Sequence, residues 1–484
     1  MKKNTLSQIA FILLGSLFFP TFITSLLYIF KIEITTCTYP ISLVLLLITY
    51  YIVFYNKNEK KQFYVSLIIS VLIIALCIGT CSIFIDNSWD GPAYHIPAII
   101  KLSQGWNPIY EHIDDINILN IWSSHYPKFI WIYAANLYKI FKNFYIGASF
   151  GLIITISLFL VTFEIFKKLG KSNKYSLIIS LIYSFNLIAL SQFFTYYNDG
   201  IMGIIVLYLL MIFYALSKGI YKIENNYKIL LMIGMLLSII ANLKYNGALI
   251  AFVYFIIFYI YFIFKKKILI NKNILKGVFI IGSFVSIVSI NTYLPNIINH
   301  HNIGYPIVGK NKIDIITGFV PHMIGDSNKI EAFIKTFTSY NWEKYTYNPF
   351  YIISQDAIDC ASEQDCAING FGPFYQSIII LLIILLLYQC IKIIIQFLNK
   401  KDEIKLKRIL INNDYKFIIL LLLGFLFIIC PATWWVRYIP YFYSLPLIII
   451  ILFFEKLNKF NFQNIICILI ISIYTISLPI YGNR

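Results

Sequence analysis

Charged residues are scarce in this sequence, and glycine and proline are few. Only 13% of the 484 residues are Asp, Glu, Lys or Arg, with 22 Gly and 15 Pro. Hydrophobic residues make up 59% of the chain and aromatic residues 18%, and the mean hydropathy is +0.76. This composition lies far outside the soluble range and excludes a soluble globular protein. We therefore expect an all-α polytopic membrane protein.

The sequence also lacks an internal repeat and a low-complexity linker. It has no dense cluster of His, Asp and Glu at metal-ligand spacing, so neither a metal site nor a cofactor is predicted. The apolar runs carry almost no ionisable residue near their centres, which speaks against an ion-coupled transporter.

About thirteen apolar segments are candidate membrane spans. They cover residues 7–30, 40–55, 63–85, 144–166, 175–195, 199–217, 228–243, 247–264, 277–295, 373–398, 416–433, 438–454 and 461–479. The first resembles a signal peptide, but its apolar run continues to Phe30 without a small-residue cleavage site. We therefore expect it to be retained as a span.

The distribution of charge predicts an orientation. With the N-terminus in the cytoplasm, the cytoplasmic segments and adjoining helix ends hold 26 of the 39 basic and 7 of the 22 acidic residues, a net charge of +19. The other side has a net charge of −2. Positive-inside topology thus explains the whole basic excess, and a nucleic-acid partner is unnecessary. The abundance of Ile, Lys, Asn and Tyr is typical of an AT-rich bacterial genome, so we expect a bacterial cytoplasmic (inner) membrane protein.

Two long polar segments, 86–143 and 296–372, interrupt the spans, and the topology makes both extracytoplasmic. We expect a two-helix membrane extension over 1–62, a transmembrane module over 63–295 that includes the first loop, the second loop over 296–372, and C-terminal spans over 373–484. All six His and all seven Trp lie at the outer face in this topology. Because histidine has no place in an interfacial aromatic belt, the polar chemistry is expected there.

The first outer loop is expected to contain two surface helices. One covers Pro92–Gln104, with proline in its first turn and Gly105 closing it. The other covers 125–144 along the outer membrane surface, because a further span there would invert everything downstream. Its water-facing lysines would be Lys128, Lys139 and Lys142.

Six of the eight cysteines lie in or beside spans and are interpreted as small buried hydrophobes: Cys37, Cys77, Cys81, Cys390, Cys430 and Cys467. Cys360 and Cys366 lie in the second loop, where an oxidising compartment allows a disulfide. The sequence leaves open whether they form one.

The stretch DNSWDGPAYHIP, residues 86–97, follows directly after an apolar run. Its two carboxylates, Asp86 and Asp90, stay near the membrane surface, where they can meet both a lipid-borne and a water-borne substrate. Structural interpretations are also open. Asp90 before Gly-Pro is a common helix N-cap, and Asp86 can be a solvated helix end.

The pattern WDGPAYHIP, residues 89–97, resembles the D-x-x-x-Y-H-L-P signature in the first outer loop of some C-type (GT-C) glycosyltransferases. That superfamily includes lipopolysaccharide-core transferases, protein mannosyltransferases and the aminoarabinose transferase. Four weaker matches follow in order on the same face: HYPKF (125–129), NDG (198–200), NIGYPIVG (302–309) and WWVRYIP (434–440). Asn-Ile-Gly replaces the family's Gly-Asn-Pro, and the acid pair is spread over Asp86 and Asp90.

This resemblance implies an inverting transfer of a sugar from a polyprenyl-phosphate donor to an extracytoplasmic glycan, lipid or protein. Asp90, with Asp86 second, is the expected catalytic base, since a carboxylate at a dry membrane edge has a raised pKa. Positive charge for the leaving phosphate is expected from Arg437 and Lys244, with His95 as a further contact. The expected donor or acceptor contacts are Asp199, Tyr94 and Tyr126.

Each of these residues also has a structural interpretation. Lys244 and Arg437 can snorkel to the interface, His95 can be solvated, and an Asn-Asp-Gly turn explains Asp199 without a function. Three other functions stay open as well. They are a transporter or flippase of lipid-linked sugars, an O-antigen polymerase or ligase that uses His300, His301 and His322, and an assembly subunit without chemistry.

Overall fold

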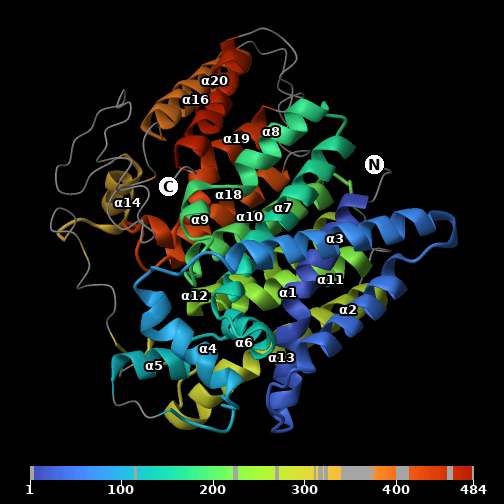
Figure 1. Ribbon diagram of the computed structural model, residues 1–484. Helices are drawn as coiled ribbons and strands as arrows, with labels where there is room; N and C mark the ends of the chain where they lie inside the picture. The colour runs from blue at the N-terminus through green and yellow to red at the C-terminus, as the bar shows by residue number, and fades with distance from the viewer. Residues whose placement is uncertain are drawn as a thin grey trace. The chain divides into compact units, whose positions relative to one another are not determined.

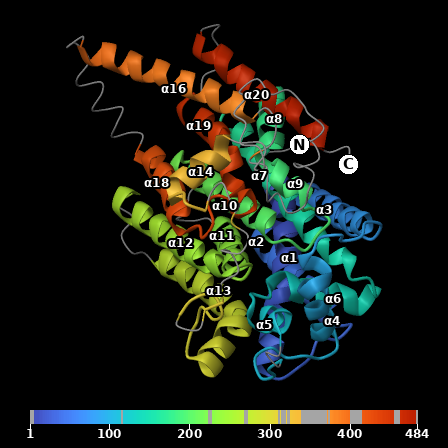
Figure 2. The ribbon, with the colours of Figure 1, turned by 90° about the vertical axis from the view of Figure 1, so that its left-hand side faces the viewer.

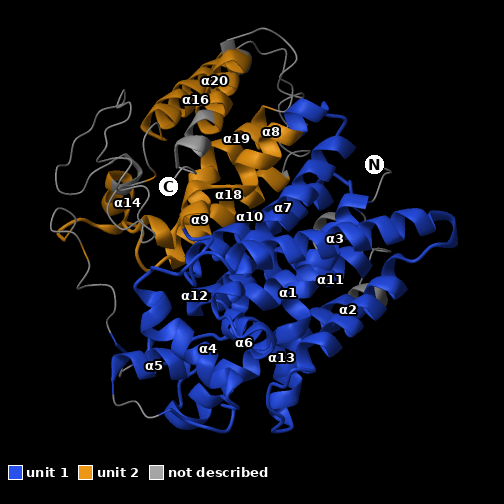
Figure 3. Ribbon diagram, in the orientation of Figure 1, with its two compact units in different colours: residues 1–176, 192–315 blue, residues 177–191, 316–484 orange. Residues whose placement is uncertain are grey.

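The computed structural model describes residues 5–113, 117–221, 227–266, 272–309, 312–313, 320, 325–338, 371, 375–398, 414–454 and 462–481. These ranges contain helices and no strand, which confirms the all-α class. Two compact units divide the chain (Figure 3): unit 1 comprises residues 1–176 and 192–315, and unit 2 comprises residues 177–191 and 316–484.

Unit 1 carries most of the helices (Figure 1). They are α1 (Thr5–Ile29), α2 (Thr38–Phe54), η1 (Lys57–Glu59), α3 (Lys60–Cys81), η2 (Gly91–His95), α4 (Ile96–Ser103), α5 (Ile118–His125), α6 (Phe129–Phe141), η3 (Tyr145–Ala148), α7 (Ser149–Lys168), α10 (Asp199–Ser217), α11 (Tyr227–Ala241), α12 (Tyr245–Lys266) and α13 (Lys272–His300). Helix α8 (Asn173–Ser184) begins in unit 1 and continues in unit 2.

Unit 2 contains the later helices (Figure 2). They are α9 (Leu187–Ser191), α14 (Lys329–Thr338), α16 (Tyr375–Leu398), α18 (Asp414–Ile429), η7 (Val436–Tyr438), η8 (Pro440–Ser444), α19 (Leu445–Phe453) and α20 (Phe462–Tyr481). Within this unit, α16 packs against α19 and α20.

Six helices in the described ranges are long and apolar enough to cross a membrane. They cover Thr5–Ile29, Lys57–Cys81, Tyr145–Lys168, Asp199–Ser217, Lys276–His300 and Tyr375–Lys392. Shorter apolar helices accompany them. A helix that crosses a membrane needs about 20 residues at 1.5 Å per residue. Helices of this length and composition are those expected of a membrane protein.

Helix α1 is the central helix of unit 1. Its most apolar window is 83% buried, and it packs against α2, α3, α6, α7, α11 and α13. Small polar side chains join it to two of these neighbours: the Thr24 hydroxyl accepts from Asn136 Nδ2 at 2.9 Å, and the Ser25 hydroxyl accepts from Asn291 Nδ2 at 2.6 Å. Such hydrogen bonds tie helices together where water is absent. Helix α1, which belongs to the expected two-helix extension over 1–62, thus lies in the core of unit 1.

The candidate span over 175–195 contains two short helices instead of one. Helix α8 ends at Ser184, and α9 covers only Leu187–Ser191. Between them Asn186 is fully buried, and its Oδ1 accepts a hydrogen bond from the Ala189 N–H at 2.8 Å. This is the geometry of an N-cap, so a new helix starts there. The 12 residues of α8 rise only about 18 Å, short of a crossing.

A helix is present where the first surface helix was expected. It consists of a π-helical turn, η2, that continues into α4, and Gly105 ends it with a φ of +112°. Positive φ is the backbone conformation for which glycine is favoured at a helix end.

The second helix is present as α6. The side of it that was predicted to face water is buried instead. Residues 129–137 are all buried, and α6 packs against α1 and α4. Lys128 is only 1% exposed, and its Nζ donates to the carbonyl oxygens of Ser124 at 2.7 Å and Tyr126 at 3.0 Å. The prediction for Lys128 is therefore wrong, because the ammonium closes the end of α5. Lys142 is exposed, and the half-buried Lys139 donates to the Ser103 carbonyl.

Four of the six cysteines predicted to be buried are buried, whereas Cys37 and Cys390 are exposed. Cys360, Cys366 and His322 lie outside the described residues.

Candidate functional site

Asp86 is a buried carboxylate with a backbone donor at each oxygen. Oδ1 accepts from the Ser88 N–H and Oδ2 accepts from the Tyr196 N–H, both at 2.9 Å, and the residue is 5% exposed. Burial raises the pKa of Asp86, and the hydrogen bonds from Ser88 and Tyr196 oppose that rise. Asp86 therefore joins the segment after α3 to the segment before α10, which is a positioning role.

Gly91 is required beside this carboxylate. A Cβ atom at position 91 would overlap the Asp86 side chain. The Gly91 N–H also donates to the Ser88 hydroxyl at 3.0 Å. The glycine of WDGP thus allows the chain to pass against Asp86 and turn into the helix.

Asp90 lies at the start of that helix and is half-buried. It occupies the N-cap position of η2, yet its side chain makes no capping hydrogen bond. The N-cap interpretation therefore does not account for this carboxylate, and Asp90 stays the candidate base.

Tyr94, His95 and Tyr126 come together around Trp131, which sequence reasoning missed. The Trp131 Nε1–H donates to His95 Nδ1 at 2.6 Å, and His95 is 2% exposed. Because an indole nitrogen only donates, Nδ1 carries no proton and His95 is the neutral tautomer protonated on Nε2. In this neutral form His95 brings no positive charge to a phosphate. The Tyr94 and Tyr126 ring centroids are 6.1 Å apart, and both side chains are buried.

Lys244 and Asp199, predicted to have separate roles, form one buried ion pair. Lys244 Nζ contacts Asp199 Oδ1, and the side chains are 8% and 0% exposed. The pair joins the residue before α12 to the first residue of α10, and Asn198 Nδ2 supports it by donating to the Leu243 carbonyl at 3.3 Å. Asp199 thus neutralises the positive charge of Lys244, which was expected to bind the donor phosphate.

Arg437 belongs to unit 2, whereas the other predicted site residues belong to unit 1. It lies on η7 after α18 and is 8% exposed. The guanidinium carbon is 4.5 Å from the Trp435 ring centroid and 5.5 Å from that of Tyr438. Arg437 is therefore buried against aromatic faces, a cation–π arrangement rather than snorkelling.

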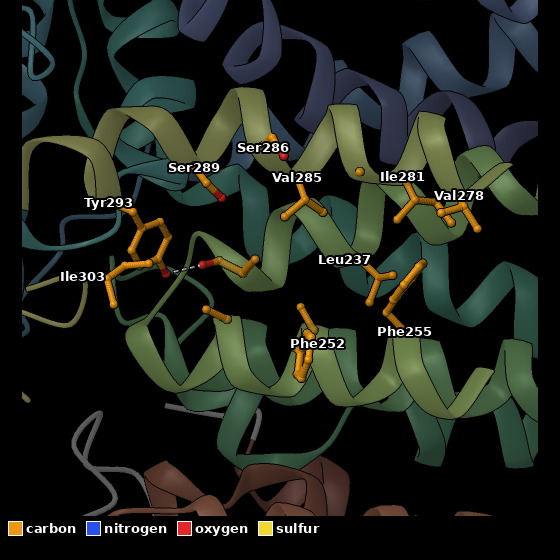
Figure 4. A pocket seen from close by; sticks show the side chains of 14 residues that line it. Leu237, Phe252, Phe255, Val278, Ile281, Val285, Ser286, Ser289, Tyr293 and Ile303 are labelled. Atoms are coloured by element: carbon orange, nitrogen blue, oxygen red, sulfur yellow. Dashed lines mark hydrogen bonds between the residues drawn. The ribbon is translucent and has the colours of Figure 1, made fainter. Parts of the chain in front are cut away.

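An apolar groove of 540 Å³ lies between α11, α12 and α13. Helix α11 packs against both other helices and forms the floor between them (Figure 4). Small side chains keep the space open, and a Cβ atom at Gly282 would meet nothing within 4 Å. The lining is Leu237, Ala241, Ala248, Ala251, Phe252, Phe255, Val278, Ile281, Gly282, Val285, Ser286, Ser289, Tyr293 and Ile303. The volume is in the range of ligand sites, roughly 300–1,000 Å³, and the chemistry is that of a hydrocarbon site.

Three histidines lie close together; they come from the segment before α5, the end of α5 and the end of α13. The His125 ring centroid is 4.7 Å from that of His300 and 5.7 Å from that of His112. His300 stacks on Tyr305 at 3.8 Å. We call His112, His125 and His300 the histidine cluster. Its sequence signal was the one-sided distribution of histidine, but no local spacing connects position 112 with position 300.

In the part of the chain that the structure describes, no group of three or more His, Cys, Asp or Glu residues is arranged to hold a metal ion. No family model matches the chain, and no curated protein and no solved structure is significantly similar to it.

Proposed function

We propose that this protein is a GT-C-type membrane glycosyltransferase. It transfers a sugar from a polyprenyl-phosphate donor to an acceptor outside the cytoplasm, with inversion at the anomeric carbon. The acceptor is a cell-surface glycan, a lipid or a protein, and the enzyme serves cell-envelope glycan biosynthesis. The lipid-linked sugar is the donor substrate, and no cofactor is assigned.

One observation carries the proposal: a continuous row of rings joins the acid-bearing loop to the apolar groove. Tyr94, four residues after Asp90, lies 6.1 Å from Tyr126 between ring centroids. Tyr126 lies 5.9 Å from Tyr245, and Tyr245 lies 6.2 Å from Tyr293, which lines the groove. The groove suits the hydrocarbon chain of a lipid-linked sugar, and the row of rings connects that groove to the loop that carries Asp90.

The chemistry assigns each group one task. The acceptor hydroxyl loses its proton to Asp90, and its oxygen forms a bond to the anomeric carbon. The bond from that carbon to the phosphate oxygen breaks, and its electron pair leaves with polyprenyl phosphate. Asp86 holds the loop that carries Asp90, and the neutral His95 offers an Nε2–H to an oxygen of the substrate.

The proposed topology has about thirteen crossings, with the broken pair α8 and α9 together forming one. The N-terminus is cytoplasmic, the active site faces outward, and the membrane is a bacterial cytoplasmic membrane. The basic excess of the short connecting segments supports this orientation.

The substitution Asp90→Asn tests the assignment. We expect transfer to fall by roughly 10²- to 10⁴-fold, the usual contribution of a general base, while expression and thermal stability stay unchanged. The measurement is transfer of a radiolabelled sugar from lipid donor to acceptor in membranes, with acceptors identified by mass spectrometry of surface glycans from a deletion strain. If Asp90→Asn transfers sugar at the wild-type rate, Asp90 is not the catalytic base.

A further inference from the structure

The histidine cluster lies at one end of the apolar groove. Tyr293 and Ile303 line the groove at this end. His300 follows Tyr293 by seven residues on α13, about 10 Å along the helix. Tyr245 connects the two features, because its hydroxyl contacts the carbonyl oxygens of His125 and Tyr305 while its ring approaches Tyr293.

Asn296 fixes the buried member of the cluster. Its Nδ2 donates to the Tyr305 carbonyl at 3.0 Å and to the Tyr245 hydroxyl at 3.2 Å, so its Oδ1 is the acceptor for His125 Nδ1 at 2.7 Å. His125, which is 1% exposed, therefore carries a proton on Nδ1. It anchors the other two rings, of which His112 is exposed and His300 is half-buried.

The two outer imidazoles suit an anionic group. Their ring centroids are 6.3 Å apart, so a group between them meets both. An imidazole offers an N–H donor in its neutral form and a second one when it is charged. The two lysines that neighbour Tyr245 and Tyr126 in the sequence are already engaged: Lys244 is paired with Asp199, and Lys128 donates to backbone carbonyls.

We propose that His112 and His300 bind the phosphate of a prenyl-phosphate lipid whose chain lies in the groove between α11, α12 and α13. The inference rests on the proposed function for the identity of that lipid as the sugar donor. The sequence predicted that Lys244 binds the leaving phosphate. In this proposal the two histidines bind it instead. When the bond between the anomeric carbon and the phosphate oxygen breaks, the electron pair stays on that oxygen, and the imidazole N–H groups donate to it.

Two ligands distinguish binding of the phosphate group from binding of the hydrocarbon chain. Purified full-length protein in detergent is titrated with farnesyl phosphate and with farnesol, and bound ligand is measured by native mass spectrometry. We expect the wild type to prefer the phosphate. His112→Gln and His300→Gln should each weaken farnesyl phosphate about tenfold, the cost of one charge-assisted hydrogen bond, and leave farnesol unchanged. Gly282→Phe should weaken both ligands.

The chain offers matched controls. His301→Gln removes an exposed imidazole next to His300, and Gly79→Phe adds a ring at another exposed helical glycine whose Cβ would meet nothing within 4 Å. Both controls should bind as the wild type does. Because His112 is exposed, its variant keeps the test valid even if His300→Gln does not fold.

Retention of the full phosphate preference by the His112→Gln, His300→Gln double variant would overturn the proposal. An equal loss of farnesyl phosphate affinity in the His301→Gln control would also overturn the proposal. The binding test is independent of transfer. If the binding pattern holds but no sugar is ever transferred, the glycosyltransferase assignment fails and the lipid site stands. If transfer occurs but the histidine variants bind normally, only the histidine assignment fails.

Discussion

The acid-bearing loop and the apolar groove belong to the same unit but are built in opposite ways. Around Asp86 both carboxylate oxygens accept backbone hydrogen bonds, and position 91 has no room for one carbon atom. Along the groove, small residues leave 540 Å³ open and almost no polar atom is present. In the proposed enzyme, the first region holds the catalytic base in place, and the second accommodates the lipid chain. Substitutions should therefore cost stability in the loop and ligand affinity in the groove.

Gly91→Ala should have the largest effect on stability. The new methyl group displaces the Asp86 side chain, which strains the turn and disrupts two hydrogen bonds. We expect the free energy of unfolding to fall by about 3–5 kcal/mol. The measurement is SDS-induced unfolding in mixed micelles. A loss below about 1 kcal/mol would mean that the loop adapts and is less rigid than described.

Asp86→Asn should destabilise less. The amide keeps one acceptor oxygen, but its NH₂ group then faces the N–H of Ser88 or Tyr196. A loss of about 1–3 kcal/mol is expected, the cost of an unsatisfied buried donor. The same unfolding assay measures it, and transfer by the remaining folded protein should exceed that of Asp90→Asn. If Asp86→Asn is instead fully stable and inactive, Asp86 is the base.

Lys128 should give the fold a pH dependence. Burial lowers the pKa of Lys128 to about 7 in the folded protein, far below its ordinary value of 10.5. The unfolded chain then binds more protons between these values, so stability should rise as the pH increases above about 7. We expect a gain on the order of 1–2 kcal/mol between pH 7 and pH 9 in the wild type.

The substitution Lys128→Met should abolish that gain, whereas Lys142→Met, at an exposed lysine on the same segment, should preserve it. Unfolding measured at the two pH values provides the comparison. An identical rise in wild type and Lys128→Met would show that another group causes the pH dependence.

Gly282→Phe should have the smallest effect on stability, within about 0.5 kcal/mol, because the ring enters open space. Its effect should appear in binding of the hydrocarbon chain, measured with farnesol against the Gly79→Phe control. Unchanged farnesol binding would mean that the groove does not accept the chain.

The sequence alone determined the fold class of the protein and the place of the acid-bearing turn. Long apolar runs predict helices in a membrane because hydrophobicity is a local property, and WDGPAYHIP predicts an acid-bearing turn that enters a helix because proline and glycine act locally. The helix ending at Gly105 was correct for the same reason.

Only the tertiary structure decided which side chains meet. The break at Asn186 was missed because the apolar run continues on both sides of it, although Asn is a favoured N-cap residue. Lys128 looks like a water-facing lysine until α5 supplies the carbonyls that bury its ammonium. The pairing of Lys244 with Asp199 and the meeting of His112 with His300 join distant positions. Hydrophobicity and turn propensity are carried by neighbouring residues, whereas charge compensation and burial depend on contacts that exist only after folding.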